Sequence, residues 1–282
     1  MVAHPQLPPD AAPRQRTYAR AVPHSAGRDH FPFGSYRRRI RLVATSPTVV
    51  ESGMEDDLHS FTVRVEHDGE QVRKVTADAI RQPWSTCHEA AEPLHVVEGM
   101  TLSPSCLAVG ARTDATRQCT HLFDLAGLAA AHAWRVAAGG RARRQYDMSM
   151  AYVPLSEAAR QPRDVTLLRD GAPVLTYAVA GLKVVGPEPY ASADARGGFF
   201  RWAEANLPPD EAEAAVVLKR ASLIGLSRGL DLDRYATIAD MPGVAPVCWT
   251  QQPERAPVAF RVKGMIRDHD PAPDRMLASG PF

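Results

Sequence analysis

The chain has 282 residues, of which 45% are hydrophobic, and a formal net charge of +1. This length allows one large domain or two modest ones around a sizeable core, and the composition excludes a wholly disordered chain. The near-zero charge gives no long-range field for nucleic acid or acidic lipid. The basic runs at 35–41 and 141–144 are therefore expected to be solvated faces or edges, and a nucleic-acid partner is not expected.

The sequence contains no run of about 20 apolar residues, so no membrane span is expected. The first 33 residues are rich in Pro, Ala and Arg and lack an apolar signal core, which argues against secretion and favours the cytoplasm. The four cysteines, at positions 87, 106, 119 and 248, are accordingly expected to be reduced thiols.

In chain order, residues 1–33 are predicted to form a flexible arm, because Pro and charge dominate and apolar periodicity is absent. Residues 38–45 follow as a strand, and 46–57 are expected to turn the chain. Apolar and polar residues then alternate on both sides of Asp68-Gly69, which predicts a hairpin with Phe61, Val63 and Val65 facing the core.

Two helices are predicted next. The pattern Thr86-x-x-Glu89 is typical of a capping box, so a helix should begin at Cys87 and run towards Gly99. After a loop over 100–116, residues 117–136 have the periodicity of an amphipathic helix that ends at Gly139-Gly140. Its expected buried residues are Leu122, Leu125, Leu128 and Ala129.

The second half begins again with strands. Residues 146–153 alternate, Asp170-Gly171 predicts a hairpin, and 258–264 could pair as a late strand. A long helix is predicted over 210–230, with acids in its first turn. The prediction is an α+β fold in four parts: an arm at 1–33, a unit at 34–140, a β-rich unit with the long helix at 141–270, and a tail at 271–282.

The residues that could carry chemistry lie near the predicted helix starts. Cys87 and Cys119 each stand at a helix N-terminus, where free N–H groups and the dipole stabilise a thiolate. His121 follows Cys119 by two residues, and His59 opens the hairpin beside Asp56 and Asp57. The set His59, Cys87, Cys119 and His121 has ligand types that suit zinc.

A plainer interpretation is open for the same residues. A single cysteine is more often a small buried hydrophobic residue than a ligand, and a histidine at a helix start often bonds a backbone carbonyl. The sequence contains neither a C-x-x-C nor an H-E-x-x-H pattern, so the spacing alone is weak evidence for a metal.

Three segments, "MEDDLHSFTVRV", "PWSTCHEAAEPLHVVEGM" and "QCTHLFDLAGLAAAHA", resemble the bacterial domain-of-unknown-function family 2889. The second half, with "LLRDGAPVLTYAVAG" and "DEAEAAVVLKRASLIGLSRGLDLDR", resembles that family too, so the similarity covers about residues 36–270. The resemblance implies one unit and names no substrate.

The order of the candidate residues is also similar, more distantly, to the NifU-like iron–sulfur scaffold proteins. The resemblance implies a NifU-like hairpin and helix unit at 34–140, in which Asp57 matches the scaffold aspartate, Cys87 its middle cysteine and Cys119 its last. Glu55 stands where the first scaffold cysteine would be, and His121 follows Cys119 where the scaffold histidine precedes it. These differences put cluster assembly in doubt but leave a site suitable for zinc or nucleophilic chemistry.

The resulting hypothesis is a cytoplasmic protein that acts on a small organic or acyl substrate by hydrolysis or isomerisation. Its candidate catalytic residues are Asp57, His59, Cys87, Cys119 and His121, with zinc as the cofactor that the set suits. Two alternatives stay open, an iron–sulfur or sulfur-carrier protein and a non-catalytic structural or binding module. A homo-oligomer is compatible with the sequence.

Overall fold

The structure is a computed structural model of the chain, and it describes residues 30–278. Antiparallel strands dominate it. They are β1 (Ser35–Ser46), β2 (Val49–Asp56), β3 (Ser60–His67), β4 (Val72–Arg81), β5 (Arg143–Ala151), β6 (Arg163–Arg169), β7 (Ala172–Ala180) and β8 (Lys183–Gly186).

The helices lie after β4, after β5 and after β8. The α-helices are α1 (Thr120–Ala137), α2 (Leu155–Ala158), α3 (Tyr190–Arg196), α4 (Phe199–Asn206) and α5 (Pro209–Gly225). The 3-10 helices are η1 (Ser85–Val97), η2 (Ala108–Ala111), η3 (Ala115–Arg117), η4 (Leu226–Gly229), η5 (Leu232–Arg234), η6 (Ile238–Asp240), η7 (Trp249–Gln251), η8 (Ala256–Val258) and η9 (Pro273–Arg275).

All eight strands form one antiparallel sheet in the order β4-β3-β2-β1-β5-β6-β7-β8. β1 connects the strands of the first half of the chain to those of the second half, because it pairs with β2 on one side and with β5 on the other. Arg38, for example, lies opposite Asp56 on β2 and opposite Met148 on β5. The predicted α+β class is confirmed.

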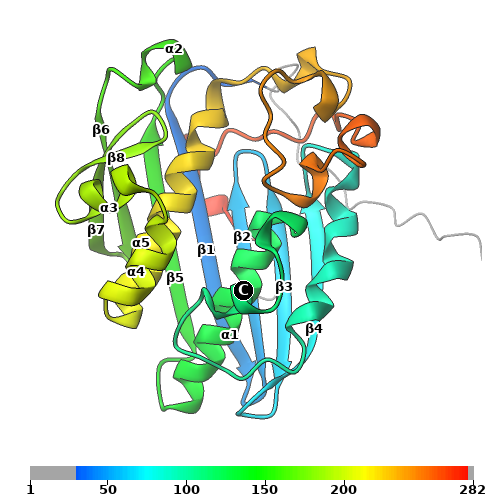
Figure 1. Cartoon of the computed structure of the whole chain (residues 1–282), viewed down its shortest axis with the longest axis vertical. Helices are drawn as coiled ribbons and strands as arrows, with labels where there is room; N and C mark the ends of the chain where they lie inside the picture. The colour runs from blue at the N-terminus through cyan, green and yellow to red at the C-terminus, as the bar shows by residue number, and fades with distance from the viewer. Residues whose placement is uncertain (1–29, 279–282) are drawn as a thin grey trace, which may run out of the picture.

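Two long helices pack on the same face of this sheet, α1 over β2 and β3 and α5 over β5, β6 and β7 (Figure 1). The four residues of α1 that were expected to be buried, Leu122, Leu125, Leu128 and Ala129, all lie in the core. Small residues allow α1 to lie close to the strands: the Ser52 hydroxyl, on β2, donates to the carbonyl of Leu125 at 3.1 Å. The apolar core is therefore a layer between the sheet and these two helices.

Most of the predicted strands and both long helices are confirmed. The hairpin at Asp68-Gly69 joins β3 to β4, and that at Asp170-Gly171 joins β6 to β7. Phe61, Val63 and Val65 are buried as predicted.

Three details of the prediction are wrong. Residues 46–57 do more than turn the chain, because 49–56 form strand β2 between β1 and β3. The helix expected from Cys87 is the 3-10 helix η1, which begins at Ser85 and contains Pro93. Its N-cap is Trp84 with no side-chain cap, and the Thr86 hydroxyl is buried without a partner among the described residues, so no capping box forms.

The late strand predicted at 258–264 is the third error. Among residues 30–278 this stretch forms only isolated bridges, Trp84 with Arg261 and Thr237 with Phe260. Two prolines and several polar residues surround it, and such sequences favour short turns over a continuous ladder.

Most of the predicted arm lies outside the described residues, and so do the last four residues of the predicted tail. Residues 30–33 are described: Phe31 is buried, and the Phe33 carbonyl accepts a hydrogen bond from Arg228. At the other end, Leu277 is buried and its N–H donates to Glu55. Within the described part of the chain, no helix is long and apolar enough to cross a membrane.

Candidate functional site

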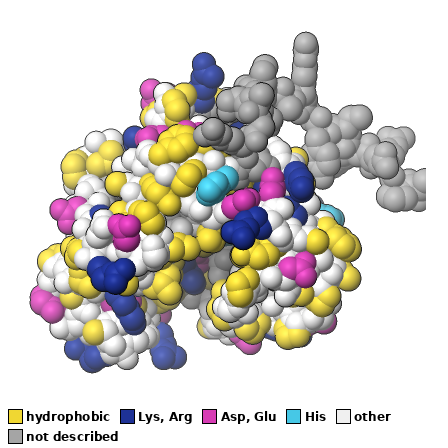
Figure 2. Space-filling model, turned by 90° about the horizontal axis from the view of Figure 1, so that it is seen from above, with side chains coloured by type: hydrophobic (Ala, Val, Ile, Leu, Met, Phe, Trp, Pro, Cys, Tyr) yellow, Lys and Arg dark blue, Asp and Glu magenta, His cyan; other side chains and the backbone are white. Residues whose placement is uncertain are grey.

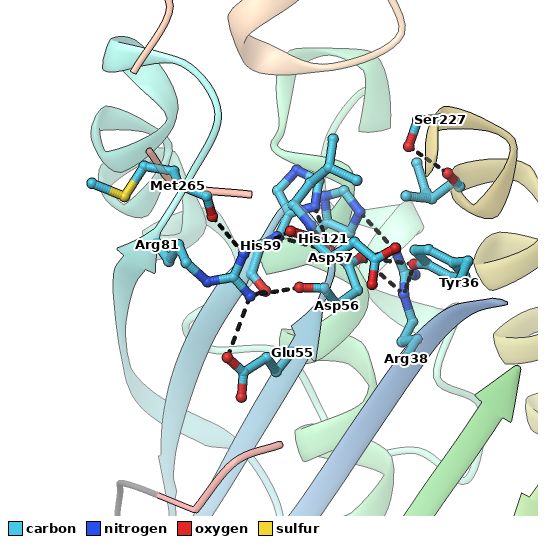
Figure 3. A network of polar contacts seen from close by, with 12 residues as sticks. Tyr36, Arg38, Glu55, Asp56, Asp57, His59, Arg81, His121, Ser227 and Met265 are labelled. Carbon is cyan, nitrogen blue, oxygen red and sulfur yellow. Dashed lines mark hydrogen bonds and ion pairs between the residues drawn. The ribbon is translucent and has the colours of Figure 1, made fainter. Parts of the chain in front are cut away.

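The candidate site lies where β2 ends and β3 begins, beside the first turn of α1. Asp56 is the last residue of β2, and its carboxylate closes the turn by accepting the N–H groups of Leu58 and His59 at 2.9 and 2.7 Å. Arg81 holds the same turn from β4 by donating to the backbone carbonyls of Asp56 and His59 (Figure 3). The turn is thus fixed by both its own carboxylate and a buried guanidinium.

Asp56 is the centre of the polar network. One of its carboxylate oxygens, Oδ1, accepts from His59 Nδ1 at 3.0 Å, and the other, Oδ2, accepts from Tyr36 at 2.8 Å and from Arg38 at 2.6 Å. Burial by itself would raise the pKa of Asp56, but His59 and Arg38 outweigh it and hold the pKa well below the ordinary value. The carboxylate is therefore ionised and can only accept hydrogen bonds.

His121 joins the network through Arg38, whose Nη2 lies 3.2 Å from His121 Nε2. The two imidazole rings of His59 and His121 stack with centroids 4.1 Å apart. Burial, with further help from His59 and Arg38, lowers the pKa of His121 well below its ordinary value, so this ring is neutral near pH 7.

The hydrogen bonds assign opposite tautomers to the two rings. Arginine can only donate, so His121 Nε2 must accept and the proton of this ring is on Nδ1. An ionised Asp56 can only accept, so His59 Nδ1 must donate. When the His59 ring is neutral, its lone pair is therefore on Nε2. Neither His59 Nε2 nor His121 Nδ1 has a protein partner within residues 30–278.

Asp57 points to another partner. Its carboxylate accepts from Arg228 at 2.5 Å, and both side chains are 1% exposed. Burial raises the pKa of Asp57 to about 7, against the opposing effect of Arg228. Its Oδ1 has no partner among the described residues. Figure 3 shows Asp57 beside Asp56 and the two histidines, so the predicted aspartate lies next to the network without bonding either ring.

Of the predicted residues, the structure brings His59 and His121 together and leaves the cysteines apart from them. Within residues 30–278, Asp56, His59 and His121 are the group of potential metal ligands whose atoms lie within 4.8 Å of one another, and no such group includes a cysteine. Cys87, Cys106, Cys119 and Cys248 are all unpaired, as expected for reduced thiols.

The two candidate cysteines are buried. Burial raises the pKa of the Cys87 thiol to about 12 and raises that of Cys119 as well. Cys119 is the N-cap of α1, and the N–H groups of that first turn lower its pKa, but burial and the nearby Cys87 and Cys248 outweigh them. Desolvation therefore outweighs the effect of the helix N-terminus, and neither cysteine is expected to be a thiolate.

Sequence reasoning missed Arg38, Tyr36 and Asp56 as members of the network. The basic run at 35–41 was expected to be solvated, but it forms the central strand β1, where Arg38 is 5% exposed. The signal that could have found Asp56 is its spacing from His59, since an aspartate accepts N–H groups two and three residues later in a turn.

A pocket extends from this network between α1, α5 and the sheet. Its free volume is about 20 Å³, room for a single water molecule, and it is lined by Arg38, Ile40, Met54, Cys106, Leu107, His121, Asp124, Leu125, Leu128, Val216, Val217 and Arg220. Figure 2 shows the molecule hollowed between two lobes on the side where α1 and α5 cover the sheet. Its walls are mainly apolar.

Comparisons with known proteins find a similarity to a family model over part of this chain. No curated protein matches it. The resemblance to the NifU-like scaffold proteins gains no support from them. Residues 42–135, which hold Asp56, His59, Cys87, Cys119 and His121, match the model of the family described as "Protein of unknown function (DUF2889)".

Proposed function

We propose that the protein is an enzyme that moves a proton on a small carbonyl compound, with His59 as the base. The observation that carries this proposal is the pair of stacked imidazoles with opposite tautomers. One ring offers a lone pair at Nε2 and the other offers a proton at Nδ1, and their centroids are only 4.1 Å apart.

The reaction follows from these two free atoms. His59 Nε2 takes a proton from the carbon next to the carbonyl, and the electron pair of the broken C–H bond moves onto the carbonyl oxygen. His121 Nδ1–H donates a hydrogen bond to that oxygen as its negative charge develops. Return of the proton from His59 to the same or a neighbouring carbon completes an isomerisation, and a water deprotonated by His59 would give hydrolysis in the same geometry.

The other members of the network position the two rings. Asp56 holds His59 in the tautomer that leaves Nε2 free and stabilises the imidazolium that forms during the step. Arg38 holds His121 by donating to its Nε2 and balances the charge of Asp56. Arg81 acts one step further away, because it fixes the turn that carries Asp56 and His59.

Solvent deuterium exchange tests this proposal without a known product. A panel of aliphatic ketones and acyl thioesters is incubated with the protein in D₂O, and deuterium at the carbon next to the carbonyl is measured by mass spectrometry. The wild-type protein should catalyse uptake for at least one class, and His59→Gln should reduce the rate by about 100-fold or more. Asp56→Asn should reduce it as well, because its amide no longer fixes the tautomer of His59.

The control is His95→Gln, which alters an exposed histidine whose side chain is 56% accessible and pairs with Glu98. This variant should exchange at the wild-type rate. Uptake that persists unchanged in His59→Gln would overturn the proposal.

A zinc site is the rival proposal, and it uses the same residues. The potential ligand atoms of Asp56, His59 and His121 lie within 4.8 Å of one another. Against it, both Asp56 oxygens already accept hydrogen bonds, and the Arg38 guanidinium lies between Asp56 and His121. These donors do not fit a divalent cation unless Arg38 moves away. Stoichiometric zinc in freshly purified protein, lost in His121→Ala, would favour the rival.

The iron–sulfur or sulfur-carrier role and the non-catalytic module stay as further alternatives. The carrier role requires a reactive thiol, and the buried thiols of Cys87 and Cys119 do not favour one. If the protein is a non-catalytic structural or binding module, no compound of the panel should exchange deuterium.

A further inference from the structure

A second pocket lies at the end of α1 that is farther from the stacked histidines. It has about 540 Å³ of free space, which is within the range of small-molecule sites. Trp134, in its wall, follows His121 by about 20 Å along the helix, at 1.5 Å per residue. This arginine pocket is lined by Pro104, His132, Trp134, Arg135, Ala138, Gly139, Gly140, Arg141, Arg143, Arg144, Asp170, Pro208, Pro209 and Asp210.

A tight turn after α1 brings the basic run at 141–144 back beside the end of that helix. Gly139 has a φ of +85°, and the N–H of Gly140 donates to the Arg135 carbonyl at 2.8 Å. A Cβ on Gly140 would lie 2.8 Å from that carbonyl oxygen, so a larger residue would push the turn away from α1. The two glycines therefore place the basic run next to Arg135.

Two arginines of the arginine pocket are held in position by a buried carboxylate. The Glu213 side chain is 0% exposed and pairs with Arg135 at 2.8 Å and with Arg144 at 3.1 Å. Tyr146 donates to the same carboxylate at 2.6 Å. Asp210, whose side chain is 48% exposed, pairs with the same two arginines at 3.0 and 3.1 Å. Both guanidinium groups are thus oriented before any ligand arrives, which lowers the entropic cost of binding.

The arginine pocket also carries positive charge that the chain does not neutralise. Arg141 and Arg143 are exposed, and neither side chain has a hydrogen-bond or ion-pair partner among residues 30–278. Four arginines and two aspartates line the pocket, which leaves an excess of two positive charges. One of these aspartates, Asp170, already accepts the N–H of Gln145 at 2.7 Å. The excess charge favours an anionic ligand.

Trp134 adds an aromatic surface beside these charges. It lines the arginine pocket and is 40% exposed, which is unusual for so large an apolar side chain. No aromatic ring or cation among the described residues stacks on it. An exposed indole next to arginines is suited to a ligand that has both a planar ring and a phosphate.

We infer that the arginine pocket binds a nucleotide, with the base on Trp134 and the phosphates at the arginines. Guanidinium groups match the geometry of phosphate oxygens and can bond them in pairs. The inference goes beyond the proposed function and does not depend on it, because the arginine pocket shares no residue with the histidine network.

ADP, GDP and inorganic pyrophosphate provide the probes. Each is titrated into the full-length protein by calorimetry at constant salt, without added metal. At least one of the two nucleotides should bind about tenfold more tightly than pyrophosphate, because stacking on Trp134 adds to the phosphate contacts. Affinity for pyrophosphate equal to that for both nucleotides, or no binding of any probe, would overturn the inference.

Variants separate the base from the phosphates. Trp134→Leu should weaken the nucleotide by about tenfold and change pyrophosphate by less than twofold. Arg141→Gln should weaken nucleotide and pyrophosphate alike, by about tenfold, and adding Arg143→Gln should weaken both further. The matched control is Arg196→Gln, which alters an exposed arginine on α3 outside the arginine pocket and should bind as the wild type does.

Asp210→Asn gives a test of opposite sign. Asp210 competes with the phosphates for Arg135 and Arg144, so removing its charge should strengthen binding of nucleotide and pyrophosphate by about fivefold. Nucleotide binding that is unchanged in Arg141→Gln, or that is weaker in Asp210→Asn, would contradict the placement of the phosphates at these arginines and overturn the inference.

Discussion

Asp56 and Asp57 are neighbours in the sequence with different partners in the fold. Asp56 faces α1 from the end of β2 and bonds Tyr36, Arg38 and His59. Asp57 begins the turn that follows and pairs with Arg228. Successive residues at a strand end point in opposite directions, so one carboxylate orients a histidine and the other anchors a distant helix end.

Arg228→Met tests the second of these roles. Arg228 is 1% exposed in its side chain and bonds Asp57, Asp268 and the Phe33 carbonyl, so its loss leaves buried charge without a partner. The free energy of unfolding, measured by urea denaturation, should fall by about 3–5 kcal/mol. Adding Asp57→Leu should recover part of that loss. A single variant as stable as the wild type would show that the buried pair contributes nothing.

The pH dependence of stability tests the burial of His121. Its pKa is lowered in the folded chain from an ordinary value of 6.5, by burial and by the neighbouring His59, Arg38 and Arg220. Below about pH 6.5 His121 binds a proton in the unfolded chain but stays neutral in the folded chain. Stability therefore rises with pH through this window and falls as the pH drops. The contribution is at most about 1.4 kcal/mol per pH unit.

His121→Gln should remove this contribution. The difference in unfolding free energy between wild type and variant should therefore shrink as the pH falls from 7 to 5, with Asp56 still ionised across the whole range. A difference that is constant with pH would show that His121 is protonated alike in both states.

At the residue scale, the sequence was sufficient to select His59 and His121 but not the groups that organise them. Histidines near strand and helix starts stand out because few other side chains titrate near neutral pH. Arg38 could not be found in the same way, since a run of arginines is usually solvated and only the pairing of β1 with two other strands buries it. The same pairing brings Asp56 opposite Arg38.

At the element scale, α1 packs closely against the loop that holds Cys106, and the contact is made at Gly127. A Cβ added to Gly127 would lie 2.1 Å from the Cys106 carbonyl oxygen, which is too close for any side chain. Cys106 and Leu107 also line the pocket beside His121, and the missing side chain of Gly127 lets their loop lie against α1. The width of the pocket therefore depends on this contact between α1 and the loop before it.

Gly127→Ala should displace that loop. The expected loss is about 1–3 kcal/mol of unfolding free energy, as for other overpacked core positions. Gly110→Ala is the matched control, because a Cβ at Gly110 meets nothing within 4 Å. Equal thermal midpoints for the two variants would show that the Cys106 loop yields without cost.

Elements with strong local signals were predictable, and those fixed by tertiary contacts were not. The Asp-Gly turns and the two amphipathic helices each carry their signal within about ten residues. β2 has no clean alternation, because Ser52 and Gly53 are both buried against neighbours, and only its place between β1 and β3 makes it a strand. The 3-10 helix η1 was predicted as an α-helix because Thr86 and Glu89 match a capping box that does not form.

At the scale of the whole molecule, one sheet runs through both halves of the sequence. β1 pairs along its length with β2 from the first half and with β5 from the second. The pocket beside His121 is likewise shared, because α1 supplies one wall and α5 the other.

Cooperative unfolding follows from this arrangement. Urea denaturation should give one transition with the same midpoint by tryptophan fluorescence and by circular dichroism, because neither half keeps its core without β1. Fragment 141–278, which lacks β1, should have no cooperative transition when it is expressed alone. Two separate transitions in the intact chain would instead indicate two independent units.

The tautomers of the two stacked histidines carry the account of the site, and nitrogen-15 NMR of the imidazole rings measures them directly. At pH 7 in the wild-type protein, His121 should carry its proton on Nδ1 with the lone pair on Nε2. His59 should carry a proton on Nδ1, which donates a hydrogen bond to Asp56. His59 should lose this preference in Asp56→Asn. If His121 carries its proton on Nε2, or if either ring shows the shifts of a metal-bound nitrogen, the assignment of base and donor is contradicted.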